Sequence, residues 1–132
     1  MPPGCRRLPR AAVISTVPQV DTAQFEAEIE DCSTPIILDV FASWCGPCQM
    51  MAPEMTAVAE HYGDRLRVLK VDSDEEEEVA TALQVRGLPT VMLIRDMSVV
   101  MRFEGALMAK DIVQVASEGA PLQYFSSDFS SS

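Results

Sequence analysis

Two cysteines only three positions apart stand between two strongly patterned segments of the chain. Residues 35–42, before Cys45, form a nearly continuous apolar run, which is typical of a central β-strand covered on both faces. After Cys48, apolar residues recur at spacings of four and three until Gly63, which predicts an amphipathic helix that ends at the glycine. The residues expected on its buried face are Ala52, Met55, Ala59 and Tyr62. The cysteine pair is therefore expected where a buried strand passes into a helix.

The remaining pattern alternates short apolar runs with helical periods, which indicates a mixed α/β domain. Further strands are expected at 13–17, 66–72, 90–95 and 99–103, and further helices from Asp21 to about Cys32, from Asp74, and over 110–116. A β-α-β-α-β portion is thus followed by a hairpin and a last helix. The predicted architecture is a central mixed β-sheet of about five strands flanked by about four helices.

Two capping pairs mark expected helix starts. Asp21 is followed three positions later by Gln24, and Asp74 is followed by Glu77. In such pairs each side chain accepts a hydrogen bond from the backbone of the other residue. We therefore expect helices to begin directly after Asp21 and Asp74.

Length and composition indicate one domain with polar ends. A chain of 132 residues with 48% hydrophobic residues has enough apolar material for a single core, which we expect over residues 13–121. Residues 1–12 contain arginines and no acidic residue, so they are either the remnant of a transit peptide or an ordinary disordered terminus. Residues 122–132 are rich in serine and are expected to form a flexible tail, unless its three aromatic residues dock on a surface.

The charge balance excludes two classes of partner. Ten Lys and Arg residues against 20 Asp and Glu residues give a net charge of −10, which repels phosphate backbones and anionic lipids. The purely apolar stretches are only a few residues long, so the sequence predicts neither a membrane span nor a secretory signal. We expect a soluble intracellular protein that binds neither nucleic acid directly nor a membrane.

The cysteine spacing alone is compatible with a structural disulfide, half of a metal site, or a pair that cycles between dithiol and disulfide. A cysteine-rich zinc site needs a second pair at comparable spacing, and Cys5, Cys32 and the single histidine, His61, do not supply it. A structural disulfide across two residues closes too small a loop to constrain the unfolded chain much. A redox pair is therefore favoured, and no metal or other cofactor is expected.

The expected helix start gives the two cysteines different roles. Unpaired backbone N–H groups and the positive end of the helix dipole favour a thiolate there, so Cys45 is the expected nucleophile, on an exposed sulfur. Cys48 lies one turn inside the helix, shielded from solvent, and is expected to resolve the mixed disulfide between Cys45 and a target. Gly46 leaves room for the target's backbone, and Pro47 suits the first helical turn.

The segment ASWCGPC at residues 42–48, preceded by ILDVF at 37–41 and followed by RGLPT at 86–90, resembles the thioredoxins. The resemblance extends from Val17 to Pro121. It implies the thioredoxin fold and an enzyme that reduces disulfides of target proteins.

The resemblance also implies a target-binding surface around the cysteines. The backbone of Leu88 would pair with an extended target segment, next to a cis peptide bond at Pro89, which faces the cysteine pair. Gly105 and Ala106 would be the small residues beside the groove, unless Gly105 is an ordinary turn glycine. Trp44 would either shield the site or contact the target, unless it is an ordinary core aromatic.

Asp39 lies in the middle of the apolar run and matches the family's buried acid, with Lys70 as the accompanying lysine. A carboxylate in a doubly covered strand is costly unless it has a partner or a function. Burial is expected to raise the pKa of Asp39, so that it takes the proton from Cys48 when that thiol attacks, while Lys70 limits the desolvation penalty. The alternative is a partly exposed acid at the end of the strand.

A closer resemblance is to the plastid thioredoxins of the z type, in residues 70–76, 84–90 and 103–106. It implies a chloroplast location, in the stroma or nucleoid, and reduction by ferredoxin-dependent thioredoxin reductase or another thioredoxin-linked donor. It also implies association with the plastid transcription complex and with fructokinase-like proteins. The main expectation is a monomeric disulfide reductase. The alternative is a thioredoxin-fold scaffold of that complex with secondary redox activity, to which an exposed Met50 would contribute an adaptable partner surface.

The chain departs from the family pattern at two positions. Gln49 replaces a common lysine after the second cysteine, which removes a positive charge near the thiols. Met97 stands in the predicted hairpin where glycine is usual, so the turn geometry there is left open.

Overall fold

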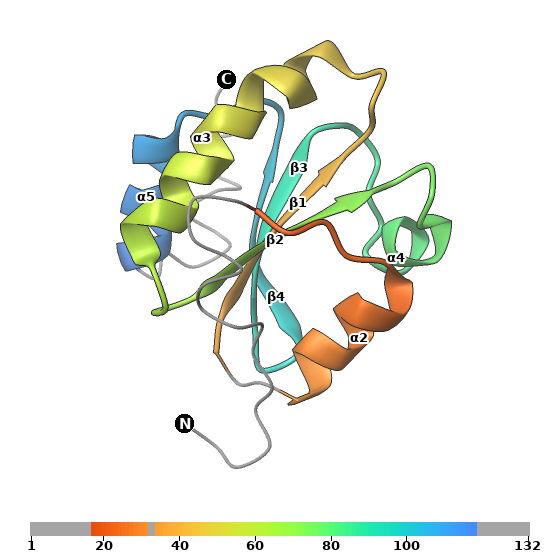
Figure 1. Ribbon diagram of the computed structural model, residues 1–132, viewed down its shortest axis with the longest axis horizontal. Coiled ribbons are helices and arrows are strands. Elements are labelled where there is room, and N and C mark those ends of the chain that lie inside the picture. The colour runs from red at the N-terminus through yellow and green to blue at the C-terminus, as the bar shows by residue number, and fades with distance from the viewer. Residues whose placement is uncertain (1–16, 32–33, 119–132) are drawn as a thin grey trace.

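The computed structural model describes residues 17–31 and 34–118, which form a four-stranded sheet between two layers of helices (Figure 1). The strands are β1 (Ile36–Phe41), β2 (Arg67–Asp72), β3 (Thr90–Arg95) and β4 (Ser98–Glu104). The helices are α2 (Thr22–Asp31), α3 (Gly46–Tyr62), α4 (Glu77–Ala82) and α5 (Ala109–Glu118). Helices α3 and α5 cover one face of the sheet and α2 and α4 the other, which confirms the predicted α/β architecture. The predictions for 1–12, Cys5, Cys32 and 122–132 lie outside the described residues.

Strand β1 lies inside the sheet, whose strand order is β2-β1-β3-β4. It runs parallel to β2 and antiparallel to β3, so the sheet is mixed, as expected. Its side chains alternate between the two helical layers: Ile37 packs with α3 and α5, whereas Leu38 and Val40 pack with α2 and α4. By this alternation Asp39 lies on the α3 face of the sheet.

The first predicted strand, at 13–17, lies almost entirely outside the described residues. Directly after it, residues 18–20 pair with the outer edge of β2. Lys70 N donates to Pro18 O, and Val20 N donates to Lys70 O, both at 2.9 Å. The expectation of about five strands thus corresponds, in the described part of the chain, to four strands and a short parallel bridge at the β2 edge.

Helix α2 begins with the reciprocal cap that the sequence predicted. Gln24 N donates to Asp21 Oδ1 at 2.8 Å, and Asp21 N donates to Gln24 Oε1 at 2.9 Å. The Gln24 amide is one of the N–H groups that a helix start leaves unpaired, and this contact satisfies it.

The second predicted capping pair is wrong. Helix α4 begins at Glu77, and the side chain of the preceding Glu76 makes no capping bond. Glu76 Oε1 instead accepts hydrogen bonds from the backbone N and the Oγ1 of Thr22, at 2.9 and 2.8 Å, and so joins this segment to the start of α2. Asp72 Oδ1 accepts a hydrogen bond from Asp74 N at 2.8 Å and closes the turn before the helix. The Asp74 carboxylate instead accepts a hydrogen bond from Trp44, next to Cys45.

Helix α3 buries Met55 and Tyr62 as predicted, but the predicted Ala52 and Ala59 do not lie in the core. Ala52 is exposed and Ala59 is half-buried. The buried residues of this helix are Cys48, Met51, Met55, Val58 and Tyr62. Both sets have spacings of three and four, because the helix carries apolar residues on several sides. Met51 and Val58, which have larger side chains, occupy the core in place of Ala52 and Ala59, since they bury more apolar area.

The β3–β4 hairpin turns through two residues with left-handed backbone conformations. Asp96 has a φ of 53° and Met97 a φ of 63°. Positive φ at both central residues is the pattern of a type I′ turn, in which Asn or Asp followed by Gly is preferred. Met97 therefore occupies a position where a Cβ atom is unfavourable by roughly 1–2 kcal/mol.

Met97→Gly is expected to raise the free energy of unfolding by about 1 kcal/mol, because the greater entropy of glycine in the unfolded chain offsets only part of the gain. Met97 is 62% exposed, so little packing is lost. Equilibrium unfolding in urea measures the change. Met97→Ala keeps a Cβ atom and is the control; an equal gain in both variants would contradict the explanation.

Candidate active site

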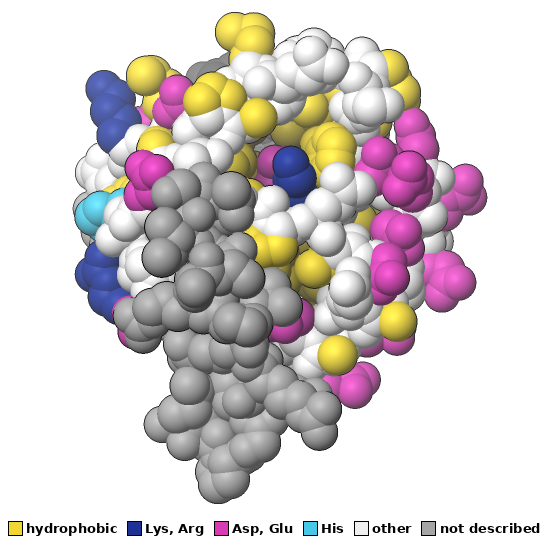
Figure 2. Space-filling model, viewed as in Figure 1, with side chains coloured by type: hydrophobic (Ala, Val, Ile, Leu, Met, Phe, Trp, Pro, Cys, Tyr) yellow, Lys and Arg dark blue, Asp and Glu magenta, His cyan; other side chains and the backbone are white. Residues whose placement is uncertain are grey.

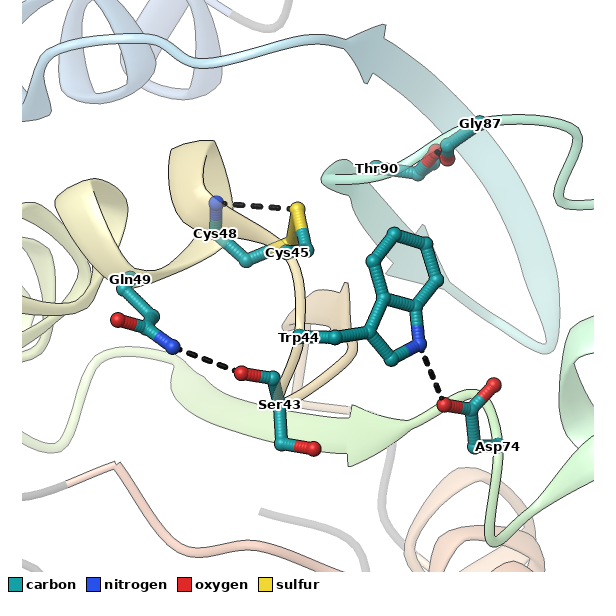
Figure 3. The surroundings of a disulfide bond; sticks show 8 residues. All are labelled: Ser43, Trp44, Cys45, Cys48, Gln49, Asp74, Gly87 and Thr90. Atoms are coloured by element: carbon teal, nitrogen blue, oxygen red, sulfur yellow. Dashed lines mark hydrogen bonds between the residues drawn. A yellow bond between two sulfur atoms is a disulfide. The ribbon is translucent and has the colours of Figure 1, made fainter.

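Cys45 and Cys48 form a disulfide at the N-terminus of α3. Cys45 is the N-cap residue, and its Sγ accepts a hydrogen bond from Cys48 N at 3.2 Å (Figure 3). Pro47 lies in the first turn, where a missing N–H leaves no intrahelical bond unmade. The helix start thus points a backbone donor at the sulfur of Cys45, an arrangement that stabilises a thiolate once the disulfide is reduced.

Both cysteines are buried in this disulfide form, with an exposed fraction of 4% each. The sequence predicted shielding for Cys48 and exposure for Cys45, and the second prediction does not hold in the oxidised state. The physical reason is a small apolar cluster, in which Ala42 is buried with the two cysteines and Leu88 packs against them. The disulfide therefore has its own apolar surroundings, apart from the two main cores.

The loop before β3 brings a proline to this cluster. The Leu88–Pro89 peptide bond is cis, as the resemblance implied, and Pro89 is buried. Thr90 Oγ1 donates to Gly87 O at 2.6 Å and closes the loop (Figure 3). Gly105 N donates to Pro89 O at 2.8 Å, so the end of β4 is tied to the same loop. Leu88 thus packs against the cysteines, and a backbone hydrogen bond ties Gly105 to its neighbour Pro89.

Small residues leave the surface around the disulfide open. Gly46 and Pro47 are exposed, and a Cβ atom added at Gly46 would meet no atom within 4 Å. Gly105 has a φ of 100°, a conformation in which any side chain is strained, and Ala106 beside it is exposed. Space for a partner's backbone is therefore available at Gly46 and beside the end of β4.

Trp44 is 70% exposed, so it is not a core aromatic. Its indole Nε1 donates a hydrogen bond to Asp74 Oδ2 at 2.7 Å (Figure 3). Asp74 opens the acidic segment 74–78, on the side of the molecule where acidic side chains gather (Figure 2). Sequence reasoning missed Asp74 as a site residue and assigned it to a helix cap. It acts as a positioning residue that fixes the plane of the exposed indole.

Asp74→Ala is expected to slow reduction of a protein disulfide about fivefold, the equivalent of about 1 kcal/mol, because Trp44 must then be ordered during binding. The readout is single-turnover reduction of insulin by the pre-reduced protein. Trp44 is the chain's only tryptophan, so a fall in its fluorescence anisotropy would report the freed indole. Glu75→Ala removes a neighbouring exposed charge and keeps the hydrogen bond; an equal loss of rate in this control would assign the effect to charge.

Asp39 and Lys70 are partners in the β1–β2 register. Asp39 is 4% exposed, and its Oδ1 has no hydrogen-bond partner among the described residues. Burial raises the pKa of Asp39 from 3.8 to about 6, and the charge of Lys70 offsets part of the rise. Lys70 Nζ lies 5.5 Å from the centre of the Phe41 ring. The expected burial of this acid is confirmed, and the alternative of a partly exposed acid is wrong.

A cavity of about 370 Å³ joins this acid to the redox pair. Asp39 and Lys70 line it from the sheet, and Cys48 lines it from the start of α3. Asp39 and Cys48 therefore border the same space, which is large enough to hold water.

Two further findings concern the described part of the chain as a whole. No group of three or more His, Cys, Asp or Glu side chains within 17–31 and 34–118 is arranged to hold a metal ion. No helix in these ranges has the length and apolar character needed to cross a membrane.

Known proteins are similar to this chain in sequence and in structure. The sequence profile of the Thioredoxin family matches residues 16–118. A thioredoxin-like protein of Synechocystis sp. is 35% identical over 100 residues, which are 76% of this chain and 92% of that protein. The chloroplastic thioredoxin Y of Oryza sativa subsp. japonica is 36% identical over 92 residues, 70% of this chain and 55% of that protein, so this chain spans about half of its length.

A solved structure agrees with the sequence comparison. The crystal structure of chloroplastic thioredoxin z superposes with a TM-score of 0.72 and 34% identity, over 79% of this chain and 94% of that one. With the profile match covering most of the chain and a redox-capable cysteine pair at the start of α3, the chain belongs to the thioredoxin family, whose members are disulfide reductases.

Proposed function

We propose that the chain is a thiol-disulfide oxidoreductase that reduces disulfides of target proteins by cycling its CGPC motif between dithiol and disulfide. The observation that carries the proposal is the position of Cys45 Sγ, which caps α3 and accepts the backbone N–H of Cys48. A cysteine in this position has a larger fraction of thiolate than a free cysteine, and its sulfur is a better leaving group.

In the first step the Cys45 thiolate attacks a sulfur of the target disulfide. A Cys45–target disulfide forms, and the target's other sulfur leaves as a thiolate. In the second step Asp39 takes the proton of the Cys48 thiol through the cavity, and the Cys48 sulfur attacks Cys45. The Cys45–Cys48 disulfide re-forms, and the target is released with both sulfurs reduced. Lys70 limits the cost of the charged Asp39 during this step.

The target binds on the open surface around the disulfide. Trp44, held by Asp74, supplies apolar contact area, and the exposed Gly46 and Pro47 let the target's backbone approach. On the other side, the Leu88 backbone pairs with an extended target segment beside Pro89, while Gly105 and Ala106 keep the groove free of side chains.

Reduction of insulin by dithiothreitol, followed as turbidity, tests the proposal. The wild-type chain should accelerate the reaction, and Cys45→Ser should give the rate of dithiothreitol alone. Cys32→Ser leaves the Cys45–Cys48 pair intact and is the matched control. Equal acceleration by wild type and Cys45→Ser would remove the proposed function.

The chloroplast is the proposed location, in the stroma or the nucleoid, and ferredoxin-dependent thioredoxin reductase is the proposed electron donor. The support is similarity to relatives that are themselves named chloroplastic. Reduction of the Cys45–Cys48 pair by that reductase, and its absence with an NADPH-dependent reductase, is the expected result in vitro.

A second function, as a binding subunit of the plastid transcription complex or a partner of fructokinase-like proteins, is favoured by an exposed apolar surface. Met50 is 74% exposed and Met108 is 54% exposed. Glu54, one turn after Met50, accepts a hydrogen bond from Ala109 N at 2.7 Å, which places the two methionines on adjoining segments. A Cys45→Ser, Cys48→Ser double variant that still assembles with these partners would support this function, and loss of assembly would count against it.

A further inference from the structure

The side chain of Gln49 reaches back over the start of α3 and binds the turn that precedes the helix. Its Nε2 donates a hydrogen bond to Ser43 O at 2.7 Å (Figure 3). Side chains of an α-helix tilt toward its N-terminus, so a residue near the helix start is well placed to reach a carbonyl just before the helix. Gln49 therefore joins α3 to the segment that carries Trp44 and Cys45.

This segment is a tight turn between β1 and α3. Cys45 N donates to Ala42 O at 3.2 Å and closes the turn. Gln49 N donates to Cys45 O, also at 3.2 Å, which is the first backbone hydrogen bond of a helix that has Cys45 as its N-cap. Gln49 thus holds a carbonyl on each side of Trp44, that of Ser43 with its side chain and that of Cys45 with its backbone.

Packing alone does not hold the whole turn. Ala42 and Cys45, at its two ends, are buried in the apolar cluster around the disulfide, whereas Ser43 and Trp44 between them are exposed. The exposed middle of the turn is therefore placed by polar contacts. Gln49 supplies such a contact to the Ser43 carbonyl.

These contacts gain importance when the disulfide opens. In the oxidised form the Cys45–Cys48 bond holds the Cys45 sulfur beside the backbone N–H of Cys48. After reduction this covalent link is absent, and the sulfur stays beside that N–H only as far as the turn before the helix keeps its conformation. A hydrogen-bonded turn therefore preorganises the Cys45 sulfur, both for attack on a target and for re-formation of the disulfide.

We propose that Gln49 is a positioning residue for Cys45. Its side-chain hydrogen bond to Ser43 O keeps the Cys45 sulfur at the helix start in the reduced protein. The inference rests on the proposed role of Cys45 as the nucleophile and adds a residue that acts through it. It also explains how glutamine replaces the lysine that is common at this position, since the neutral amide keeps an N–H donor for the turn.

Alkylation of the reduced protein by iodoacetamide tests the inference. The reagent reacts with the thiolate, and mass spectrometry follows the Cys45 peptide separately from the other cysteines. Gln49→Met keeps the length of the side chain and removes the donor. Cys45 of this variant should react about threefold more slowly than in wild type, as expected for the loss of one hydrogen bond at an exposed site. Equal rates in wild type and Gln49→Met would overturn the proposal.

Gln24→Met is the matched control. Gln24 Oε1 accepts a hydrogen bond from Asp21 N at 2.9 Å, so the same substitution there also removes a side-chain hydrogen bond at a helix start, that of α2. A general loss of stability would act on both variants, whereas loss of a contact to the cysteine turn acts on Gln49→Met only. Cys45 of Gln24→Met should react at the wild-type rate, and equal slowing in both variants would overturn the proposal.

Two charged substitutions separate the hydrogen bond from an effect of charge. The ammonium group of Gln49→Lys can donate to Ser43 O, whereas the carboxylate of Gln49→Glu only accepts. In about 1 M NaCl, where charges are screened within about 3 Å, Gln49→Lys should react as fast as wild type and Gln49→Glu as slowly as Gln49→Met. If Gln49→Lys instead falls to the rate of Gln49→Met in high salt, charge alone explains its effect and the proposal is overturned.

Reduction of insulin keeps this inference apart from the proposed function. In a single turnover quenched with acid, the mixed disulfide of Gln49→Met should last about three times longer than that of wild type, because Cys48 attacks a less well placed sulfur. An active wild type with an equally short-lived mixed disulfide in Gln49→Met would overturn the role of Gln49 alone. A wild type no faster than Cys45→Ser would remove the proposed function, while slower alkylation of Gln49→Met would still support the role of Gln49.

Discussion

Cys48→Ser is expected to stop the reaction half-way and to leave Cys45 joined to its target by a mixed disulfide. Serine cannot attack this bond, so release depends on external thiols, and exchange without a positioned thiol takes minutes to hours. The pre-reduced variant mixed with insulin should give a covalent adduct on a non-reducing gel that dithiothreitol removes. Wild-type protein should give no lasting adduct, because its second sulfur lies one helical turn from the first.

The control variants for this adduct experiment assign the roles of the two sulfurs. Cys45→Ser should form no adduct with a protein target, because the remaining Cys48 is buried. Cys45→Ser, Cys48→Ser should likewise form none, which would exclude Cys5 and Cys32 as the attacking groups. Equal trapping by Cys45→Ser and Cys48→Ser would contradict the assignment of Cys45 as the nucleophile.

Asp39→Asn is expected to raise the free energy of unfolding by about 3 kcal/mol at neutral to alkaline pH. Burial raises the pKa of Asp39 from 3.8 to about 6, and each pH unit between these values corresponds to about 1.4 kcal/mol. Between these values the folded protein binds more protons than the unfolded chain, so its stability falls as the pH rises through this window. Above this pH window the folded protein carries the full free-energy cost of the buried carboxylate, and the substitution by asparagine removes this cost.

The gain should therefore depend on pH. Urea unfolding at about pH 8 should show the full effect, and at about pH 3, where the carboxyl is mostly protonated in both states, the wild type and Asp39→Asn should be nearly equal. Asp72→Asn is the matched control, because Asp72 is also buried but accepts hydrogen bonds from Asp74 N and Glu75 N. This control should be neutral or destabilising, and an equal gain there would mean that the effect is not specific to the unpaired carboxylate.

The same substitution should impair the second chemical step. Ionised Asp39 accepts the proton of Cys48, so single-turnover reduction by wild type should rise with pH around the Asp39 pKa of about 6. In Asp39→Asn this inflection should be absent, and mixed disulfides should last longer than in wild type. A pH profile unchanged by the substitution would remove Asp39 from the proton-transfer role.

Features set by neighbouring residues were predictable from the sequence. The apolar run before Cys45 predicted a strand covered on both faces, and the Asp21–Gln24 cap was predicted because both partners lie within one turn. The position of the cysteine pair at the start of α3 was predictable, because the hydrophobic pattern changes there from a continuous apolar run to a helical repeat. These local signals were enough for the fold and for the two sulfurs.

Features that depend on distant residues were not predictable in the same way. Asp74 looked like a helix cap, but it binds Trp44, 30 positions away in the chain. On α3, Met55 and Tyr62 were predicted correctly, but Ala52 and Met51 both fit a helical period with them, and only packing against the sheet decides between the two. The cavity beside Asp39 combines residues from two strands and a helix, a property of the tertiary structure alone.

The interior position of β1 has a mechanical consequence for the chemistry. Transient fraying of a sheet starts at its borders, here β4 and the β2 side, and reaches the middle strand last. Asp39 is carried by that middle strand, whereas the cysteines begin a helix that directly follows it. Local unfolding at the edges of the sheet therefore leaves Asp39 in place. The position of Asp39 relative to the cysteines is kept while segments at the edges change conformation to fit targets of different shapes.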